Sequence, residues 1–457
     1  MRNLDRFSKL LLIVFTLLVP ALATPLVTVD TDPDGDGPFA AGERVRGRIV
    51  VDFKGEFSDS ELALWGRLYD VEPRSVLPSH GLATISVDEK DMAQTLDKLS
   101  HDPLIQTVSP DYVAHAHGIQ SPESRFAAQD PTASFPNDPR FKEQWHLKMI
   151  GAQKAWKKSN GEGVIVAVID TGIAYAEKGR TRPVEDLAQT KIVAGYDFVN
   201  KDALAVDDAG YGTHLAGTVA QSTNNRVGVA GMAYQATLMP VKVLDEKGSG
   251  TFSGIAAGIR FAADNGAHIL LLGLGSPNDS LVMEEAVEYA HEKGCLLIGS
   301  VGVTGGETPG FPAEYEQVVG VGAVDISRKV TNYSNKGADI AAPGGYATEL
   351  EGILQNTIHA GNPRRSGYLW QAGTNCSAAH VAGVAALVMS TGVKDPDKVR
   401  EILMTTTRKM RDKRSYGAGI VMANKAVDKA RKSKSEKTHT GFILVLLALA
   451  LGLYRRK

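Results

Sequence analysis

The stretch Val164-Ile-Val-Ala-Val-Ile-Asp-Thr-Gly172 decides the fold. Its six consecutive apolar residues, most of them β-branched, predict a buried strand. That strand delivers Asp170 at its carboxyl end. Since the active sites of open α/β sheets lie at the carboxyl ends of the strands, Asp170 is the first candidate site residue.

The same kind of pattern continues along residues 137–430. Strand-like runs occupy residues 236–244, 268–274, 295–301 and 318–324, and helical stretches occupy residues 212–220, 251–265, 280–293 and 377–389. Alternating strands and helices predict an α/β domain, with a mostly parallel sheet and helices on both faces.

A smaller unit precedes this domain, over residues 48–115. Strand-like segments alternate there with two helical ones, which Ser58 and Asp88 are suited to cap. The pattern predicts a small α+β domain whose open sheet face packs on a neighbour. An acidic linker, 24–47, and a polar linker with several prolines, 116–136, flank this domain.

Both ends of the chain have the features of an exported protein. Residues 1–23 combine a basic start, an apolar run and an Ala-Leu-Ala cleavage pattern, as in a secretory signal peptide. Residues 441–457 form a second apolar run that ends in Arg-Arg-Lys, behind a basic spacer at 431–440. We expect this segment to contact a membrane, as a tail anchor or a bacterial-type sorting signal. The expected location is therefore the cell envelope or the exterior of the cell.

The composition excludes several classes of protein. Among 457 residues, 50 are Lys or Arg and 52 are Asp or Glu, which gives a net charge of −2. A near-neutral chain gives no reason to expect a nucleic-acid partner. Hydrophobic residues make up 43% of the chain, which excludes wholesale disorder, and two cysteines exclude a disulfide-rich scaffold.

Two glycine-rich helix starts complete a set with Asp170. The first is Gly-Tyr-Gly-Thr-His-Leu-Ala-Gly at 210–217, which places His214 in the first turns of a helix. The second is Gly-Thr-Asn-Cys-Ser-Ala-Ala-His-Val-Ala-Gly at 373–383. An aspartate, a histidine and a helix start, in this order, are one known chain order of the serine-protease triad.

These motifs resemble those of the subtilisin-like serine peptidases (subtilases, peptidase S8). The resemblance is supported by Asn-Asp-Pro at 137–139, Asn-Asn-Arg-Val-Gly-Val-Ala-Gly at 224–231 and Ala-Ala-Pro-Gly at 341–344. It implies a subtilisin-like fold. It also implies that residues 48–115 are a ferredoxin-like propeptide domain, which in this family is an intramolecular folding chaperone and inhibitor.

The sequence departs from the family at two positions that decide catalysis. The family's frame Gly-Thr-Ser-Met-Ala aligns with Gly-Thr-Asn-Cys-Ser, so Asn375 stands at the nucleophilic serine, and Val303 stands at the oxyanion-hole asparagine. In subtilisin, loss of the serine lowers kcat about 10⁶-fold, and loss of the asparagine lowers it about 10²–10³-fold. Either change predicts a poor enzyme. Tyr211 stands where the family usually has a histidine ahead of Gly-Thr-His, and we assign it no catalytic role.

Neighbouring residues offer partial replacements. Cys376 is the alternative nucleophile, although the family has at this position a methionine that packs beside the site. Ser377 is turned by about 200° from the nucleophile position and is expected to face away. Thr304 replaces the oxyanion donor if the alignment shifts by one residue. Asp170 and His214 are expected to remain hydrogen-bonded to each other, whether or not they serve catalysis.

The resemblance also assigns residues that bind peptide. Family members hold the substrate as an added strand along a Ser-Leu-Gly segment, which is here Gly273, Leu274 and Gly275. Ser300 and Gly302 are expected to line the first specificity pocket, with an apolar or medium-sized side chain as its guest.

A calcium site is implied in the same way. Asp138, Asp186 and Asn225 match side-chain ligands of the family, and backbone carbonyls of residues 224–229 complete a shell of oxygens of the kind that Ca²⁺ prefers. The alternative interpretation is that these three are ordinary surface-turn residues.

The sequence leaves three hypotheses open. The first is an exported pseudoprotease that binds a peptide or a protein in the old cleft. It keeps its propeptide domain attached, with residues 111–117 in the cleft in cis. The second is an active endopeptidase with a displaced nucleophile such as Cys376. The third is a structural surface protein whose cleft binds nothing.

Overall fold

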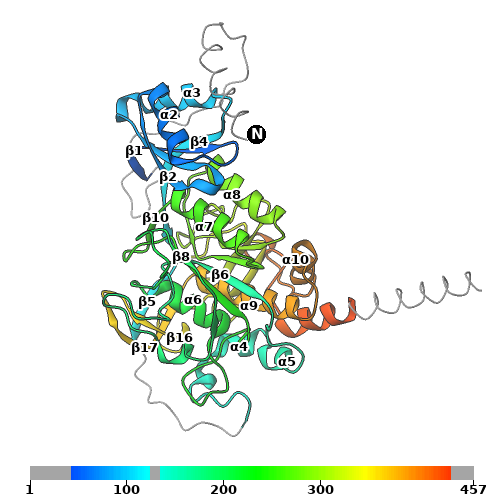
Figure 1. Ribbon diagram of the computed structural model, residues 1–457. Coiled ribbons are helices and arrows are strands. Elements are labelled where there is room, and N and C mark those ends of the chain that lie inside the picture. The colour runs from blue at the N-terminus through cyan, green and yellow to red at the C-terminus, as the bar shows by residue number, and fades with distance from the viewer. Residues whose placement is uncertain (1–42, 124–133, 434–457) are drawn as a thin grey trace, which may run out of the picture. The chain divides into compact units, whose positions relative to one another are not determined.

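The computed structural model describes residues 43–123 and 134–433 (Figure 1). These residues all belong to one unit, Gly37–Lys457. The predicted signal peptide, acidic linker, basic spacer and C-terminal segment lie wholly or largely outside the described residues. Within the described part of the chain, none of the helices has the length and apolar character needed to cross a membrane.

The N-terminal domain is an antiparallel sheet with two helices against one face. Its strands lie in the order β4-β1-β3-β2. The bounds are β1 Arg44–Phe53, α2 Asp59–Tyr69, β2 Glu72–Leu77, β3 Leu82–Ser86, α3 Met92–Ser100 and β4 Ile105–Ala116. On β1, Ile49 and Val51 pack with the helices around Trp65, whereas Val50 joins the core of the large domain. The expectation that the open sheet face packs on a neighbour is thus confirmed.

Local sequence explains where α2 begins. The Ser58 hydroxyl accepts a hydrogen bond from the backbone N–H of Glu61, and the Glu61 carboxylate accepts one from the backbone N–H of Ser58. This capping box satisfies two N–H groups that the first helical turn leaves without internal partners.

The large domain has a parallel sheet between two layers of helices. Its eight described strands lie in the order β15-β14-β13-β11-β6-β9-β7, with β8 also paired to β9. The strand bounds are β6 Ile165–Asp170, β7 Lys191–Ile192, β8 Tyr196–Asp197, β9 Thr237–Lys242, β11 Ile269–Leu272, β13 Leu296–Ser300, β14 Val318–Val324 and β15 Ile340–Pro343. The helix bounds are α4 Trp145–Met149, α5 Ala152–Trp156, α6 Tyr211–Ala220, α7 Phe252–Asp264, α8 Leu281–Glu292, α9 Thr374–Ser390, α10 Pro396–Thr405 and α11 Lys413–Tyr416.

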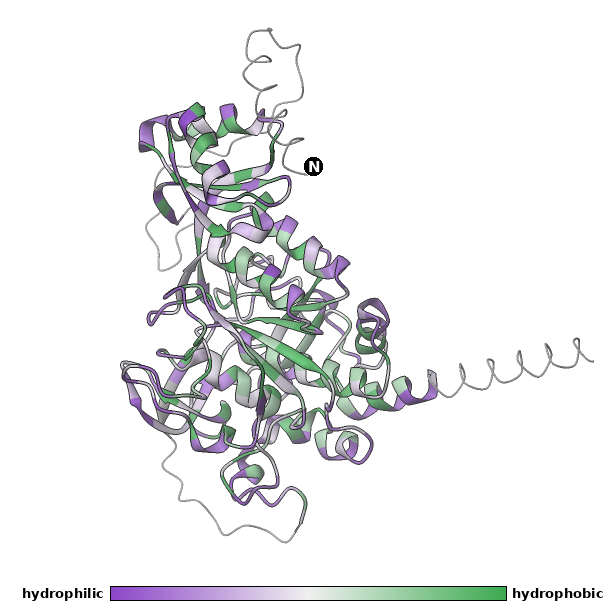
Figure 2. Ribbon diagram, viewed as in Figure 1, coloured by the Kyte–Doolittle hydropathy of each residue, from purple (hydrophilic) through white to green (hydrophobic). Residues whose placement is uncertain are grey.

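Strand β6 shows why its sequence is apolar throughout. Val166 and Val168 lie in the core beneath α6 and α9, whereas Ala167 and Ile169 lie in the core beneath α7 and α8. A strand that is covered on both faces carries no polar alternation. The central strands are accordingly among the most hydrophobic parts of the ribbon (Figure 2). The predicted α/β class and mostly parallel sheet are confirmed.

A separate three-stranded sheet was not predicted. It consists of β16 (Ile353–His359), β17 (Asn362–Ala372) and β5 (Ile119–Glu123), in the order β16-β17-β5. The prediction of a linker over 116–136 is therefore wrong for residues 119–123. The short polar segment with Pro122 carries no strand pattern of its own, and its strand conformation depends on pairing with β17.

Strand β4 belongs to both domains. Beyond the N-terminal sheet it pairs antiparallel with β10 (Ser249–Thr251) and β12 (Leu274–Gly275) of the large domain. Above α7, the guanidinium of Arg260 forms a buried, bidentate ion pair with Asp52 of β1. The N-terminal domain is therefore joined to the large one by the strand β4, which both share, and by this ion pair.

Candidate active site

The carboxylate of Asp170 is fully buried at the end of β6. Its Oδ1 accepts the backbone N–H of Thr171 at 2.8 Å, and its Oδ2 has no hydrogen-bond partner among the described residues. Burial raises the pKa of Asp170 to about 7. The side chain is therefore poised to take up a proton near neutral pH rather than to hold a fixed negative charge.

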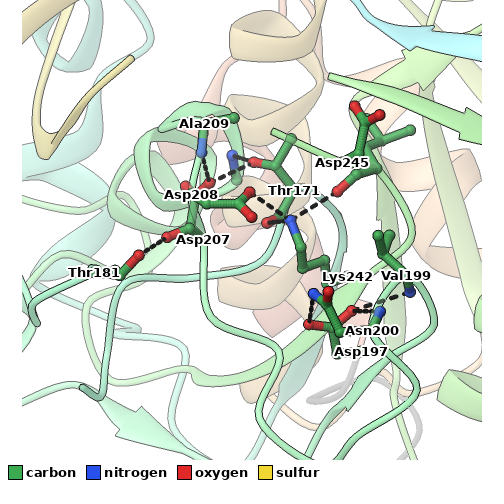
Figure 3. Close-up of polar contacts among 12 residues, drawn as sticks. Thr171, Thr181, Asp197, Val199, Asn200, Asp207, Asp208, Ala209, Lys242 and Asp245 are labelled. Carbon is green, nitrogen blue, oxygen red and sulfur yellow. Dashed lines mark hydrogen bonds and ion pairs between the residues drawn. The ribbon is translucent and has the colours of Figure 1, made fainter. Parts of the chain in front are cut away.

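A polar network around Asp207 and Thr171 fixes the start of α6 (Figure 3). The Asp207 carboxylate accepts five hydrogen bonds, from the backbone N–H groups of Ala209, Gly210 and Thr213 and from the hydroxyls of Thr171 and Thr213. The N–H groups of Gly210 and Thr213 are ones that a helix start leaves unpaired.

Lys242 supports the same turn from β9. Its Nζ is fully buried and lies 2.6 Å from Asp208 Oδ1, and it donates to the carbonyls of Thr171 and Leu244, both at 2.9 Å (Figure 3). A buried cation needs such pairing to be tolerated. The first turn of α6 is thereby held rigidly against the end of β6.

His214 does not lie in the cleft. It is fully buried on the core side of α6, where Nε2 lies 2.8 Å from the Ile353 carbonyl and Nδ1 lies 3.9 Å from Cys376 Sγ. No hydrogen bond joins it to Asp170 among residues 43–123 and 134–433. The prediction that these two remain bonded is therefore wrong. Burial lowers the pKa of His214 to about 3, so the imidazole is neutral.

Tyr211 occupies the place in the cleft where we expected His214. A methyl group added to Gly118 would lie 2.9 Å from Cδ1 of the Tyr211 ring and 2.5 Å from Asn375 Nδ2. The pKa of the Tyr211 phenol is raised, by burial first and then by the nearby charges of Asp170 and Asp207. Tyr211 therefore stands between Asp170 and Asn375. The sequence signal was present, because the family has a histidine at this position.

Helix α9 presents Asn375 to the cleft. The side chain is fully buried, its Oδ1 accepts the N–H of Cys376 at 2.8 Å, and its Nδ2 has no partner in the described part of the chain. Cys376 points the other way, toward His214, and burial raises the pKa of its thiol. The Ser377 hydroxyl donates to the Ala342 carbonyl at 3.1 Å and faces away from the cleft, as predicted.

The predicted oxyanion position, Val303, follows β13 and borders a cavity of about 410 Å³. Valine offers no side-chain donor. The neighbouring Thr304 does not replace it, because its hydroxyl donates to Asn335 Oδ1 at 2.9 Å. Neither Val303 nor Thr304 therefore supplies a side-chain donor at the predicted oxyanion position.

The predicted peptide-binding residues all lie along the chain's own segment 113–118. Leu274 and Gly275 pair with Ala116 and His115, and the Gly273 carbonyl accepts the N–H of His117 at 3.0 Å. Ser300 Oγ lies 2.8 Å from His117 Nδ1, and Gly302 lines the adjoining cavity. The pocket that we predicted from Ser300 and Gly302 is thus bordered by the imidazole of His117.

The three residues predicted to bind calcium lie together at the loop 224–229. The Asp138 carboxylate accepts the N–H groups of Asn224 and Asn225, and the Asp186 carboxylate accepts Asn225 Nδ2 at 2.8 Å and the N–H of Val229 at 2.9 Å. Burial, together with the charge of Asp138, raises the pKa of Asp186 to about 8. The three residues therefore lie within reach of one another around this loop.

A sequence model of the subtilase family matches residues 161–419. The chain belongs to the subtilase family. It is 36% identical to thermitase from Thermoactinomyces vulgaris over 296 residues, which cover 64% of this chain and 99% of thermitase. It is 33% identical to a thermophilic serine proteinase from Bacillus sp. (strain AK1) over 381 residues, which cover 82% of this chain and 85% of that one.

Two solved structures share the fold. A protease from Pseudoalteromonas arctica aligns with a TM-score of 0.60 at 34% identity, covering 65% of this chain and all of that one. Fervidolysin from Fervidobacterium pennivorans aligns with a TM-score of 0.69 at 24% identity, covering 86% of this chain and 62% of that one. The subtilisin-like fold of this subtilase is therefore established.

Proposed function

We propose that this subtilase is a pseudoprotease, which binds a peptide or protein segment in its cleft without hydrolysing it. The observation that carries the proposal is the trio Tyr211, Asn375 and Val303 around the chain's own segment. A phenol with a raised pKa is a poor proton acceptor, a carboxamide is no acyl acceptor, and valine stabilises no oxyanion.

We also propose that the N-terminal domain remains attached as an inhibitor in cis. Two observations support this. Strand β4 fills the peptide-binding edge by pairing with β10 and β12, and the chain then continues through Gly118 into β5, which pairs with β17. A segment that is hydrogen-bonded on both sides of the old catalytic centre blocks it to other peptides.

The alternative of a displaced nucleophile at Cys376 is disfavoured by its surroundings. The thiol is fully buried, its pKa is raised by that burial, and it faces His214 in the core rather than Gly118 in the cleft. A reactive cysteine needs a lowered pKa and access to substrate.

We propose further that Asp138, Asp186 and Asn225 hold a calcium ion. The two carboxylates fit, because each of their oxygens accepts a single N–H in the structure and an ionised carboxylate has about four acceptor sites. The Asn225 Oδ1 accepts the N–H of Val227 at 2.9 Å and has a second lone pair for the ion. The ion would favour the ionised forms of both carboxyls and tie the loop 224–229 to Asp186. Export from the cell is proposed on the signal-like residues 1–23 alone.

Peptide hydrolysis tests the pseudoprotease proposal. Wild-type protein and an Asp170→Ala/Asn375→Ala variant are compared on a mixture of fluorogenic peptides between pH 5 and pH 10. We expect equal, background rates for the two proteins. A wild-type rate above that of the variant would overturn the proposal.

Thermal unfolding tests the calcium proposal. Addition of Ca²⁺ at 100 times its dissociation constant stabilises a protein by about 2.7 kcal/mol. We expect Ca²⁺ to raise the Tm of wild-type protein relative to EDTA, and to leave the Asp186→Asn variant unchanged. Equal shifts in both proteins would contradict this site.

A further inference from the structure

We propose that the former catalytic centre is a glycine-selective peptide clamp. It binds an extended segment of small residues and histidines that ends in His-Gly, and it admits glycine alone at the last position. In this chain the bound segment is residues 113–118. The inference rests on the proposed function, since it requires that the chain remains uncut.

The selectivity for glycine comes from Tyr211 and Asn375. A methyl group on Gly118 would lie 2.5 Å from Asn375 Nδ2 and 2.9 and 3.1 Å from two carbons of the Tyr211 ring. The Asn375 side chain is fully buried and tethered by the Cys376 N–H, and the far edge of the Tyr211 ring borders Gly248. Tyr211 is half-buried, so the fully buried Asn375 amide is the side chain with less room to move away from an added methyl group.

The start of α9 closes the clamp from the opposite side. A methyl group on Gly373 would lie 2.2 Å from the His117 carbonyl oxygen and 3.1 Å from Gly118 Cα. Gly373 also has a φ of +148°, which disfavours any other residue. The peptide bond between His117 and Gly118 is thus enclosed by Gly373, Asn375 and Tyr211.

The preceding pocket is matched to an imidazole. His117 is only 7% exposed, its Nδ1 lies 2.8 Å from Ser300 Oγ, and its ring lies on Gly275, where a methyl group would be 2.4 Å from Cε1. Burial lowers the pKa of His117 to about 4, so the ring is bound in its neutral form. The Ser300 hydroxyl can hydrogen-bond a ring nitrogen, and Gly275, which has no side chain, leaves room for a flat ring. Together they favour a flat, polar side chain.

The other positions of the segment favour small residues. Ala114 is fully buried in the core beneath α7, and the N–H of Ala116 donates to the Gly248 carbonyl at 2.9 Å. The Ala116 methyl lies 3.3 Å from the place of a Cβ on Gly248. Larger side chains at either position would displace packed atoms.

The segment is also held beyond the clamp. Gln120 Nε2 donates to the Ala209 carbonyl at 2.9 Å, and β5 pairs with β17 at Ile119 and Gln120. Gly118 therefore lies between two anchored strands, and a change there affects the docking of both.

Hydrogen exchange of the full chain tests the clamp. We expect Gly118→Ala to increase exchange across residues 113–120 at least tenfold, with β14 unchanged. Removing the blocking amide in Gly118→Ala/Asn375→Ala is expected to restore exchange to within threefold of wild type. The control Ile119→Ala, at an exposed neighbour, stays within twofold. The proposal would be overturned if residues 113–120 exchanged in Gly118→Ala at the wild-type rate. It would also be overturned if they exchanged as fast in the double variant as in Gly118→Ala.

Peptide binding in trans tests the selectivity itself. The probe is the labelled peptide Tyr-Val-Ala-His-Ala-His-Gly-Ile-Gln, added to a Gly118→Val protein whose own segment is released. We expect at least tenfold weaker binding when the peptide's glycine is replaced by alanine or its second histidine by leucine. Equal affinity of the three peptides would overturn the clamp and leave the pseudoprotease proposal intact, because that one depends on hydrolysis.

Discussion

The two sides of the first turn of α6 differ in how their polar groups are satisfied. Beneath the turn, Asp207 accepts five hydrogen bonds. Lys242 is paired there with Asp208 and two carbonyls (Figure 3). On the cleft side, Asp170 Oδ2 and Asn375 Nδ2 have no partner within the described residues. The polar groups beneath the turn are thus paired, whereas these two atoms at the predicted catalytic positions are not.

This difference shows that the backbone pairing along the cleft does not depend on the side chains that catalysis requires. The pairing of β4 with β10 and β12 uses backbone N–H and C=O groups, which the residue types at positions 211 and 375 leave in place. Catalysis needs specific side chains in mutual contact. A subtilase that loses the second can therefore keep the first.

The largest effect is expected from restoring the missing side chains. Tyr211→His/Asn375→Ser rebuilds a histidine and a serine beside Asp170, on a scaffold that the Asp207 network already holds. We expect cleavage after His117, at least 10³-fold faster than in either single variant, because triad residues act as a unit. Intact-mass measurements over time follow the reaction.

The control for this restoration is His214. Adding His214→Gln to the restored variant is expected to leave the site of cleavage unchanged, since His214 faces the core. Cleavage that is absent both in the restored variant and after a further Val303→Asn replacement would contradict the cleft-facing position of Tyr211.

The next largest effect concerns the junction of the two domains. Asp52→Ala leaves the buried Arg260 guanidinium unpaired, at a cost of about 3–5 kcal/mol. Urea unfolding measures this loss of stability, and amide hydrogen exchange of β1 reports it locally. The matched control Asp52→Leu/Arg260→Met removes both charges and is expected to be near neutral. Equal losses in both variants would mean that packing rather than charge sets the cost.

A smaller effect is expected at Asp170, and it depends on pH. Its folded pKa of about 7 lies above the unfolded value of about 3.9. The contribution of protonated Asp170 to the free energy of unfolding is therefore fully present below about pH 3.9 and is lost as the pH rises through 7. Asp170→Asn stays neutral throughout. We expect it to be more stable than wild type by roughly 2–4 kcal/mol at pH 8.5 and by much less at pH 4.5.

Thermal unfolding at the two pH values measures this difference. Asp97→Asn, at an exposed position of α3, is the control and is expected to show no such dependence. Destabilisation by Asp170→Asn at both pH values would contradict the assignment of an unpaired, protonatable carboxyl.

The smallest effect is expected at Cys376. A thiol-directed peptide electrophile is expected to leave Cys376 unlabelled in native protein, because the side chain is fully buried and its pKa is raised. Labelling after unfolding in urea is the positive control. Native labelling that disappears in the His214→Ala variant would instead support a displaced nucleophile.

Much of the fold was predictable because apolar runs report burial directly. The run 164–169 falls on β6, and 318–324 coincides with β14. The strand β5 was not predictable, since its polar sequence adopts its conformation by pairing with β17. Strands of this kind depend on distant partners that leave no local pattern.

The site was predicted in part for a comparable reason. Asn375 and Val303 were found because a missing hydroxyl or amide is visible in the aligned motif. His214 was misplaced because it and Tyr211 both lie in the first turn of α6, three residues apart, and spacing alone does not say which of them faces the cleft. Contacts with Ile353 and Gly118 decide it.

The most direct test of the central claim is the intact mass of the purified chain, expressed without residues 1–23. We predict a single species that retains residues 24–117 joined to the large domain, because Asn375 and Tyr211 cannot open the bond between His117 and Gly118. A product that begins at Gly118, and that disappears on replacement of Asp170 by alanine, would contradict this account.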